Sequence, residues 1–128
     1  MTDTLPPQEK VHGLMVNADL STGPFYIDGM DTTPKLFRKR CHDLGQRTAL
    51  REKTFGIWRS HSWDEYFTRA KHLGLGLVSL GLKRGEVVSI LSEDNKEWMY
   101  TDMGVQCVGG ICSGVYTTDS AAQLEYLV

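Results

Sequence analysis

The order of apolar and polar positions along this chain predicts an α/β fold. Residues 66–80 place apolar side chains at steps of four and three, the spacing of one helix face. Residues 87–91 (VVSIL) and 111–116 are short runs typical of buried strands, covered on both faces as in a parallel sheet. A helical pattern from about 96 to 108 lies between them. Strand, helix and strand in this order form the unit of a parallel α/β sheet.

Capping residues predict where the helices start and stop. Thr33 followed by Pro34 is typical of a helix start, and Gly45 is typical of its end. Ser62-Trp63-Asp64-Glu65 and Ser120-Ala121-Ala122-Gln123 have capping-box spacing, in which each end residue binds the other's free backbone N–H. Each of the first three predicted helices has an expected buried face. The faces are Leu36, Phe37, Cys41 and Leu44 in the first helix; Tyr66, Ala70, Leu73, Leu77 and Leu80 in the second; and Trp98, Met99, Met103 and Cys107 in the third.

Two partly alternating runs predict a β-hairpin before the second helix. They are residues 48–53 (TALREK) and 57–62 (IWRSHS), joined by the glycine-containing loop 54–56. Residues 1–30 hold three of the four prolines and show no sustained periodicity, so we expect an irregular arm there. The α/β part is then 31–128.

The end of the chain favours a truncated domain. The last predicted helix runs for about two turns to Val128 without a capping residue. Two parallel strands alone leave open sheet edges, which native sheets usually cover or pair. We therefore expect the neighbouring elements to lie downstream.

Composition narrows the class of protein. With 128 residues, 41% hydrophobic and 23% charged, the chain has the makeup of one globular domain. Its net charge of −2 provides no positive field for nucleic acid, which we do not expect as a partner. Three cysteines match no disulfide or zinc pattern, and the N-terminus lacks the features of a signal peptide. These features favour a cytoplasmic location.

Histidines, cysteines and charged clusters provide no self-contained active site. No pair of histidines has metal-binding spacing; the four are His12, His42, His61 and His72. Cys107 falls on the apolar face of a predicted helix, where cysteine behaves as a small hydrophobic residue. Glu93, Asp94 and Glu97 fit the N-terminus of a helix, where the dipole favours negative charge. The basic face of the first helix is expected to be solvated, with peripheral membrane contact as its alternative; it comprises Lys35, Arg38, Lys39 and Arg40.

Two glycine-rich stretches are expected to be structural. Residues 73–77 (LGLGL) superficially resemble a dinucleotide-binding loop, but Ser79 replaces the third glycine and the segment lies within a helix. Residues 109–114 (GGICSG) lack the lysine and hydroxyl residue of a phosphate-binding P-loop, which favours a turn. We assign no catalytic, cofactor-binding or metal-binding residue in this sequence.

Five segments in order resemble the N-terminal portion of AMP-forming acyl-CoA synthetases, members of the adenylate-forming superfamily. They are residues 33–37 (TPKLF), 49–58, 62–66 (SWDEY), 92–98 (SEDNKEW) and 109–118. The Phe-Gly-Ile-Trp and Gly-Val-Tyr-Thr-Thr stretches within them are most similar to long-chain and bubblegum-type fatty acyl-CoA synthetases. Lys96 and Thr117 depart from the family, since many relatives have proline there.

The resemblance implies the N-terminal part of the large adenylate-forming domain. Such enzymes join a fatty acid to AMP from ATP with Mg²⁺, then pass the acyl group to coenzyme A. The family's Ser/Thr/Gly-rich loop ending in Pro-Lys-Gly, aromatic-Thr-Glu motif, ribose-binding aspartate and C-terminal lysine do not occur in this sequence. We therefore expect a catalytically incomplete fragment of a long-chain fatty acid–CoA ligase, which binds none of ATP, Mg²⁺ and coenzyme A tightly by itself.

Three alternatives remain at this point. A luciferase-like or aryl-acid ligase would share the same segments. A short, non-catalytic α/β binding or regulatory module, derived from such an enzyme, would keep the fold without the chemistry. A dinucleotide-binding module would use the region around Gly74.

Overall fold

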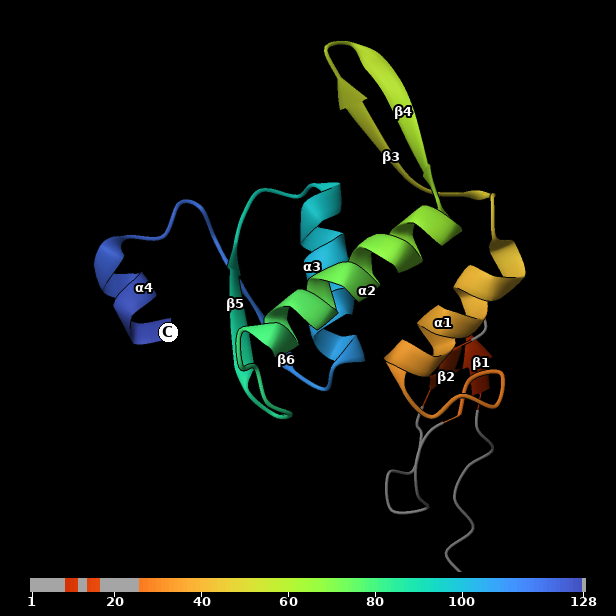
Figure 1. Ribbon diagram of the computed structural model, residues 1–128, viewed down its shortest axis with the longest axis horizontal. Coiled ribbons are helices and arrows are strands. Elements are labelled where there is room, and N and C mark those ends of the chain that lie inside the picture. The colour runs from red at the N-terminus through yellow and green to blue at the C-terminus, as the bar shows by residue number, and fades with distance from the viewer. Residues whose placement is uncertain (1–8, 12–13, 17–25, 128) are drawn as a thin grey trace, which may run out of the picture.

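Helices and short sheets alternate along the chain, as the sequence predicts. The computed structural model describes residues 9–11, 14–16 and 26–127. In chain order the elements are β1 (Glu9–Val11), β2 (Leu14–Val16), α1 (Thr33–Leu44), β3 (Thr48–Thr54), β4 (Ile57–Ser62), α2 (Trp63–Ser79), β5 (Val87–Leu91), α3 (Lys96–Cys107), β6 (Ile111–Val115) and α4 (Ala121–Leu127). Figure 1 shows α2 and α3 at the centre, with α1 on one side and β5 and β6 on the other. The α/β class is confirmed.

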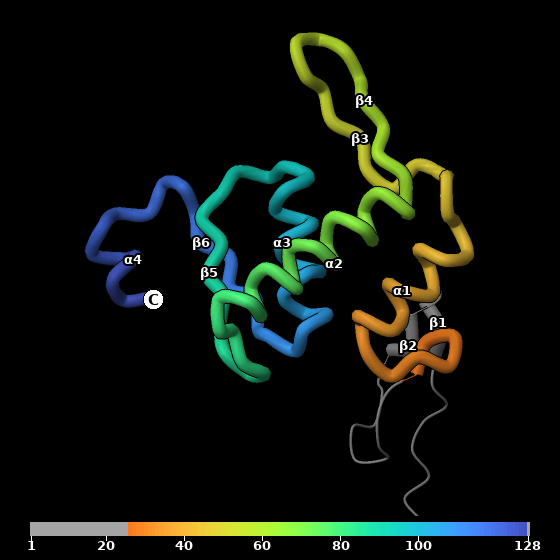
Figure 2. Tube along the Cα trace, viewed as in Figure 1, coloured from red at the N-terminus to blue at the C-terminus, as the bar shows by residue number. Residues whose placement is uncertain are grey.

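The predicted hairpin is formed by β3 and β4. The two strands pair antiparallel, and Thr54 opposite Ile57 closes a turn of two residues. Both turn residues have positive φ, 49° at Phe55 and 80° at Gly56. This is the backbone of the tight turns whose twist matches the twist of the flanking strands. The Cα trace in Figure 2 shows this hairpin extending away from the helices.

The strand, helix and strand unit is confirmed by β5, α3 and β6. The strands pair in parallel, with Val87 beside Ile111 and Leu91 beside Val115. The expectation that both faces are covered is wrong in part. Ile90 is buried, but Val87, Leu91 and Ile111 are more than half exposed. Side chains alternate across a sheet, and α3 packs against these strands, so one face is covered. The other face is open at Val87, Leu91 and Ile111, and of its apolar residues Val115 is buried.

The core joins the first three helices through aromatic side chains. Phe37 of α1 packs edge-on against Tyr66 of α2, with ring centroids 4.7 Å apart, and Tyr66 lies 5.5 Å from Tyr100 of α3. Offset and edge-on packing is the favoured geometry of aromatic pairs. The buried cluster consists of Phe37, Cys41, Tyr66, Ala70, Tyr100 and Met103.

Two predicted helix faces need correction. Leu80, expected at the end of the buried stripe of α2, is 86% exposed because the helix ends at Ser79. In α3 the expected residue Met103 is buried, but Met99 and Cys107 are exposed, and Tyr100, Gly104 and Val105, which were not expected, are buried as well. Periodicity alone did not identify this face, because small and aromatic residues make the close contact between α3 and α2.

The N-terminal arm is not wholly irregular. Strands β1 and β2 form a short antiparallel pair, and Ile27 and Met30 form an isolated bridge. Strands of three residues are too short for a sequence periodicity to show. The other residues of the predicted arm, 1–8, 12–13 and 17–25, lie outside the described part. Within the described part, no helix is long and apolar enough to cross a bilayer.

Candidate functional site

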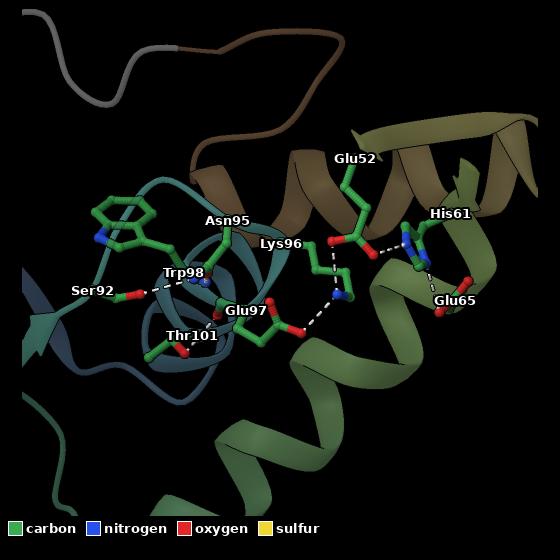
Figure 3. A network of polar contacts seen from close by, with 9 residues as sticks. All are labelled: Glu52, His61, Glu65, Ser92, Asn95, Lys96, Glu97, Trp98 and Thr101. Carbon is green, nitrogen blue, oxygen red and sulfur yellow. Dashed lines mark hydrogen bonds and ion pairs between the residues drawn. The ribbon is translucent and has the colours of Figure 1, made fainter. Parts of the chain in front are cut away.

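A polar network connects the hairpin to the first turns of two helices (Figure 3). Glu52 comes from β3, His61 from β4, Glu65 from α2, and Lys96 with Glu97 from α3. The hairpin register places Leu50 opposite His61, so Glu52 is the diagonal neighbour of His61 on the same face. The network therefore depends on the hairpin and on where α2 and α3 begin.

Lys96 and Glu52 form the long-range bond of this network. Lys96 Nζ donates to Glu52 Oε2 at 2.8 Å and lies 2.9 Å from Glu97 Oε1. The bond to Glu52 is the main reason that the pKa of Lys96 rises to about 12, and the bond to Lys96 lowers the pKa of Glu52. All three groups are therefore charged at neutral pH, and the two carboxylates share the ammonium group.

His61 lies between two carboxylates. Its Nδ1 is 2.9 Å from Glu65 Oε1, and its Nε2 is 3.2 Å from Glu52 Oε1. A neutral imidazole can donate one hydrogen bond, whereas the imidazolium can donate both. The pKa of His61 is accordingly raised above 6.5, with the hydrogen bond to Glu65 as the largest cause.

Asn95 fixes the start of α3 beside this network. Its side-chain oxygen accepts a hydrogen bond from the backbone N–H of Trp98 at 2.9 Å, and its amide donates to Ser92 Oγ at 3.1 Å. A cap of this kind satisfies one of the free N–H groups of a helix N-terminus.

The capping box expected at Ser62 is only half present. Ser62 Oγ accepts a hydrogen bond from the Glu65 N–H, but the Glu65 carboxylate binds His61 instead of the Ser62 N–H.

A groove of about 570 Å³ lies between the hairpin and the N-terminus of α3. Its walls combine aromatic and charged side chains; they are Leu50, Arg51, Glu52, Lys53, Trp58, Asp94, Asn95, Lys96, Trp98 and Met99. The cation of Lys96 is bound to carboxylates on this wall, so it is poorly placed to bind an anionic ligand. The network is suited to holding elements together.

The three histidines that the structure describes are not brought together. His12 lies outside the described residues. His42 is exposed, 3.4 Å from Asp43, and His72 is exposed on α2. His61 alone of the three described histidines joins the polar network. The described residues hold no cluster of three His, Cys, Asp or Glu side chains that could bind a metal.

The cysteines carry protonated thiols. Burial raises the pKa of Cys41 to about 11. Cys107 is exposed as a residue, but partial desolvation of its thiol also raises the pKa of that group. The pKa of Cys112 rises to about 11 by burial and by a hydrogen bond with Asp102. Since the thiolate is the reactive form, these values disfavour a nucleophilic role.

Both glycine stretches have structural roles. A Cβ on Gly74 would lie 2.7 Å from the carbonyl oxygen of Gly104, so Gly74 permits the close contact of α2 and α3. Gly109 has φ of +83° and follows the end of α3, as expected of a turn.

The charged patches are largely paired. Lys35 binds Asp31, Lys39 binds Asp43, and Arg40 binds Asp28, so three of the four cations on the basic face of α1 have carboxylate partners. In the acidic group, Glu93 accepts a hydrogen bond from Thr117 at 2.7 Å, and Glu97 contacts Lys96.

Sequence reasoning did not identify Glu52 or Lys96 as interacting residues, and it paired the Glu65 carboxylate with Ser62 and not with His61. Glu52 and Lys96 are 44 positions apart, so no local pattern connects them. One local indication did exist, because His61 and Glu65 are four positions apart across the start of α2.

The sequence profile of AMP-binding enzymes matches residues 37–128. The chain belongs to the AMP-binding enzyme family. Curated relatives include human long-chain-fatty-acid–CoA ligase ACSBG2, 32% identical over 97 residues, which are 76% of this chain and 15% of the relative. The bovine long-chain-fatty-acid–CoA ligase ACSBG1 is 31% identical over 96 residues, 75% of this chain and 13% of the relative. The chain thus spans about one seventh of their length.

Solved structures of AMP-binding enzymes share this fold. The anthranilate CoA ligase AuaEII in complex with anthranoyl-AMP superposes with a TM-score of 0.67 at 24% identity, covering 85% of this chain and 20% of that one. A fatty acid AMP ligase from Legionella pneumophila gives a TM-score of 0.63 at 16% identity, covering 68% and 15%. The predicted resemblance and its bubblegum-type relatives are confirmed.

The described residues do not fit a site for the ATP and Mg²⁺ that the family implies. They bring together no metal-ligating cluster, and the cation of Lys96, on the wall of the groove beside the hairpin, is bound to Glu52 and Glu97. We therefore derive no reaction step through these groups from the residues of this chain.

Proposed function

We propose that the chain forms the N-terminal α/β segment of a long-chain fatty acid–CoA ligase and is catalytically incomplete without further residues. The observation that carries the proposal is the 32% identity to a ligase of this specificity over three-quarters of the chain. In the complete enzyme, fatty acid, ATP and coenzyme A would react with the help of Mg²⁺ to give acyl-CoA, AMP and pyrophosphate.

The structure supports a scaffolding role for this segment. Its polar groups hold the hairpin, α2 and α3 together, as the bond between Lys96 and Glu52 illustrates. The open face of the β5–β6 sheet, with Val87, Leu91 and Ile111 exposed, is suited to packing against further elements of such a domain. The substrate-binding residues would then come from the rest of the enzyme.

The test combines the isolated chain with a chimera. In the chimera, residues 31–127 replace the matching segment of the human ACSBG2 relative. Fatty-acid-dependent ATP–pyrophosphate exchange and acyl-CoA formation are measured for both. We expect turnover by the chimera and none by the isolated chain. Turnover by the chain alone would contradict its incompleteness, and a folded but inactive chimera would contradict the ligase role.

A matched chimera tests the scaffold. Gly104→Val in the same chimera places a side chain against the backbone of α2, where a Cβ would already lie 2.8 Å from the carbonyl oxygen of Ala70. We expect this variant to lose activity together with thermal stability. A fully active variant of unchanged stability would contradict the close helix contact.

The aromatic core favours one second candidate, the non-catalytic binding or regulatory module. Phe37, Tyr66 and Tyr100 connect three helices within the chain itself, which supports independent folding. A single cooperative urea transition of the isolated chain, detected equally by fluorescence and circular dichroism, would favour this candidate. Unfolding that is broad or depends on the probe would favour a segment that requires the complete domain.

The cytoplasmic location is likewise a proposal. It is supported by the three free thiols, Cys41, Cys107 and Cys112, which fit a reducing compartment. Imaging of the tagged full-length gene product in its own cells tests it, and accumulation within a secretory compartment would contradict it.

A further inference from the structure

The tip of the β3–β4 hairpin exposes three large apolar side chains. Phe55 is 98% exposed, Ile57 66% and Trp58 63%. They lie at or next to the turn that joins β3 and β4, and Figure 1 shows this hairpin extending away from the helices. Ile57 and Trp58 are consecutive residues of β4, so their side chains lie on opposite faces and the apolar residues surround the tip of the hairpin. Large apolar side chains gathered at a projecting tip indicate an interaction site more strongly than scattered exposed residues do.

Phe55 also has a backbone conformation that is unfavourable for a phenylalanine. Its φ is +49°, in the left-handed region that favours glycine and asparagine. An almost fully exposed ring gains little by packing within the chain, so nothing in the fold offsets this conformational cost. Strain of this kind that packing does not explain is a reason to look for a function of the side chain.

The charges on the hairpin favour an anionic partner. Arg51, Lys53 and Arg59 are exposed, and Lys53 Nζ lies 6.0 Å from the centre of the Trp58 ring. Glu52 is the single acidic residue of β3 and β4, and its carboxylate is bound to Lys96 and His61. The outer part of the hairpin is therefore cationic as well as apolar.

We propose that this hairpin binds the surface of an anionic lipid bilayer, with Phe55, Ile57 and Trp58 inserted at the boundary between headgroups and acyl chains. Aromatic side chains are favoured at this depth, and Arg51, Lys53 and Arg59 would contact the anionic headgroups. The membrane contact lies on the hairpin and not on α1, whose cations Lys35, Lys39 and Arg40 are paired with aspartates. The proposal does not depend on ligase activity.

Vesicle co-sedimentation of the full 128-residue chain tests the proposal. The vesicles contain either phosphatidylcholine alone or equal parts of phosphatidylcholine and phosphatidylserine. We expect the chain to bind the anionic vesicles and to bind neutral vesicles far more weakly. Each of the variants Arg51→Gln and Lys53→Gln should weaken binding about fivefold, because one basic residue near such a surface contributes about 1 kcal/mol.

Phe55→Asn separates lipid binding from folding. Asparagine followed by Gly56 is a preferred sequence for a turn with positive φ at both residues, so the hairpin should persist. Loss of the ring should weaken binding about tenfold or more. Tyr126→Asn is the matched control, because Tyr126 is a 90% exposed aromatic residue on α4, away from the hairpin. This variant should bind the vesicles as well as the original chain does.

Three results would overturn the proposal. One is the absence of binding to anionic vesicles by a chain whose circular dichroism shows the expected helices. Another is equal binding by the Phe55→Asn variant. The third is a dimer in sedimentation velocity that Phe55→Asn abolishes, with no vesicle binding by the original chain, because the tip would then bind a second copy of this chain.

Discussion

Gly74 of α2 and Gly104 of α3 bring the backbones of two helices into direct contact. A Cβ added to Gly74 would lie 2.7 Å from the carbonyl oxygen of Gly104, and one added to Gly104 would lie 2.8 Å from the carbonyl oxygen of Ala70. Backbone atoms cannot move aside as the end of a flexible side chain can. The position of α3, and with it Lys96 and Tyr100, therefore depends on these two glycines.

Gly74→Ala should destabilise the chain by about 1–3 kcal/mol, the usual cost of adding atoms to a well-packed contact. Gly76→Ala in the same helix is the control, because a Cβ there meets nothing within 4 Å. Alanine is the better helix former, so this variant should gain about 0.5–1 kcal/mol. Urea unfolding followed by circular dichroism measures both. Equal effects at the two positions would contradict the close contact.

Tyr66 and Tyr100 should respond differently to loss of their hydroxyl groups. The Tyr66 hydroxyl donates to the carbonyl oxygen of Met99 at 3.2 Å, whereas the buried Tyr100 hydroxyl has no hydrogen-bond partner among the described residues. Tyr66→Phe should cost about 1 kcal/mol, and Tyr100→Phe should be neutral or stabilising by a similar amount. Thermal unfolding of the two variants compares them. A larger loss in Tyr100→Phe would show that this hydroxyl does have a partner.

His61 should make stability depend on pH in the neutral range. Its pKa in the folded chain is raised above 6.5 by Glu65 and Glu52, so the folded state holds the proton more tightly than the unfolded state. This contribution is complete below the unfolded pKa of about 6.5 and is lost as pH rises through the higher folded pKa. His61→Gln should therefore flatten the decline in stability on the alkaline side, measured by urea unfolding between pH 5.5 and 8.5.

Glu52 should have the opposite dependence. Lys96 lowers the pKa of this carboxyl in the folded chain, so its contribution is present above the unfolded value of 4.5 and is lost as pH falls through the lower folded value. Glu52→Gln should flatten the acid side of the same profile. His42→Gln is the control, because His42 is exposed on α1 outside this network. If His42→Gln also changed the slope of stability against pH, the effect would come from the overall charge of the chain and not from this network.

Phe55→Asn should raise the stability of the chain by about 1 kcal/mol, because asparagine tolerates left-handed backbone at lower cost than other side chains do. Gly56→Ala should have the opposite effect, since φ at this position is +80°. The midpoints of thermal unfolding report both changes. Destabilisation by Phe55→Asn would show that the ring packs within the chain.

The sequence alone determined the local elements from α1 onward and most of their boundaries, but not β1 and β2. The capping box at Ser120 is present in both directions, with Gln123 Oε1 accepting from the Ser120 N–H and Ser120 Oγ accepting from the Gln123 N–H. The hairpin and the starts of α2 and α3 also occur where the sequence predicts them. These features depend on interactions within a few residues, which a short stretch of sequence contains in full.

Tertiary structure alone decided the buried face of α3 and the composition of the polar network. Tyr100 is buried against Tyr66 because Gly74 and Gly104 let α2 and α3 approach closely, a contact that periodicity within α3 cannot indicate. The 44 positions between Glu52 and Lys96 likewise leave no trace in any local pattern. The energies of such contacts depend on both partners at once, and folding is what brings those partners together.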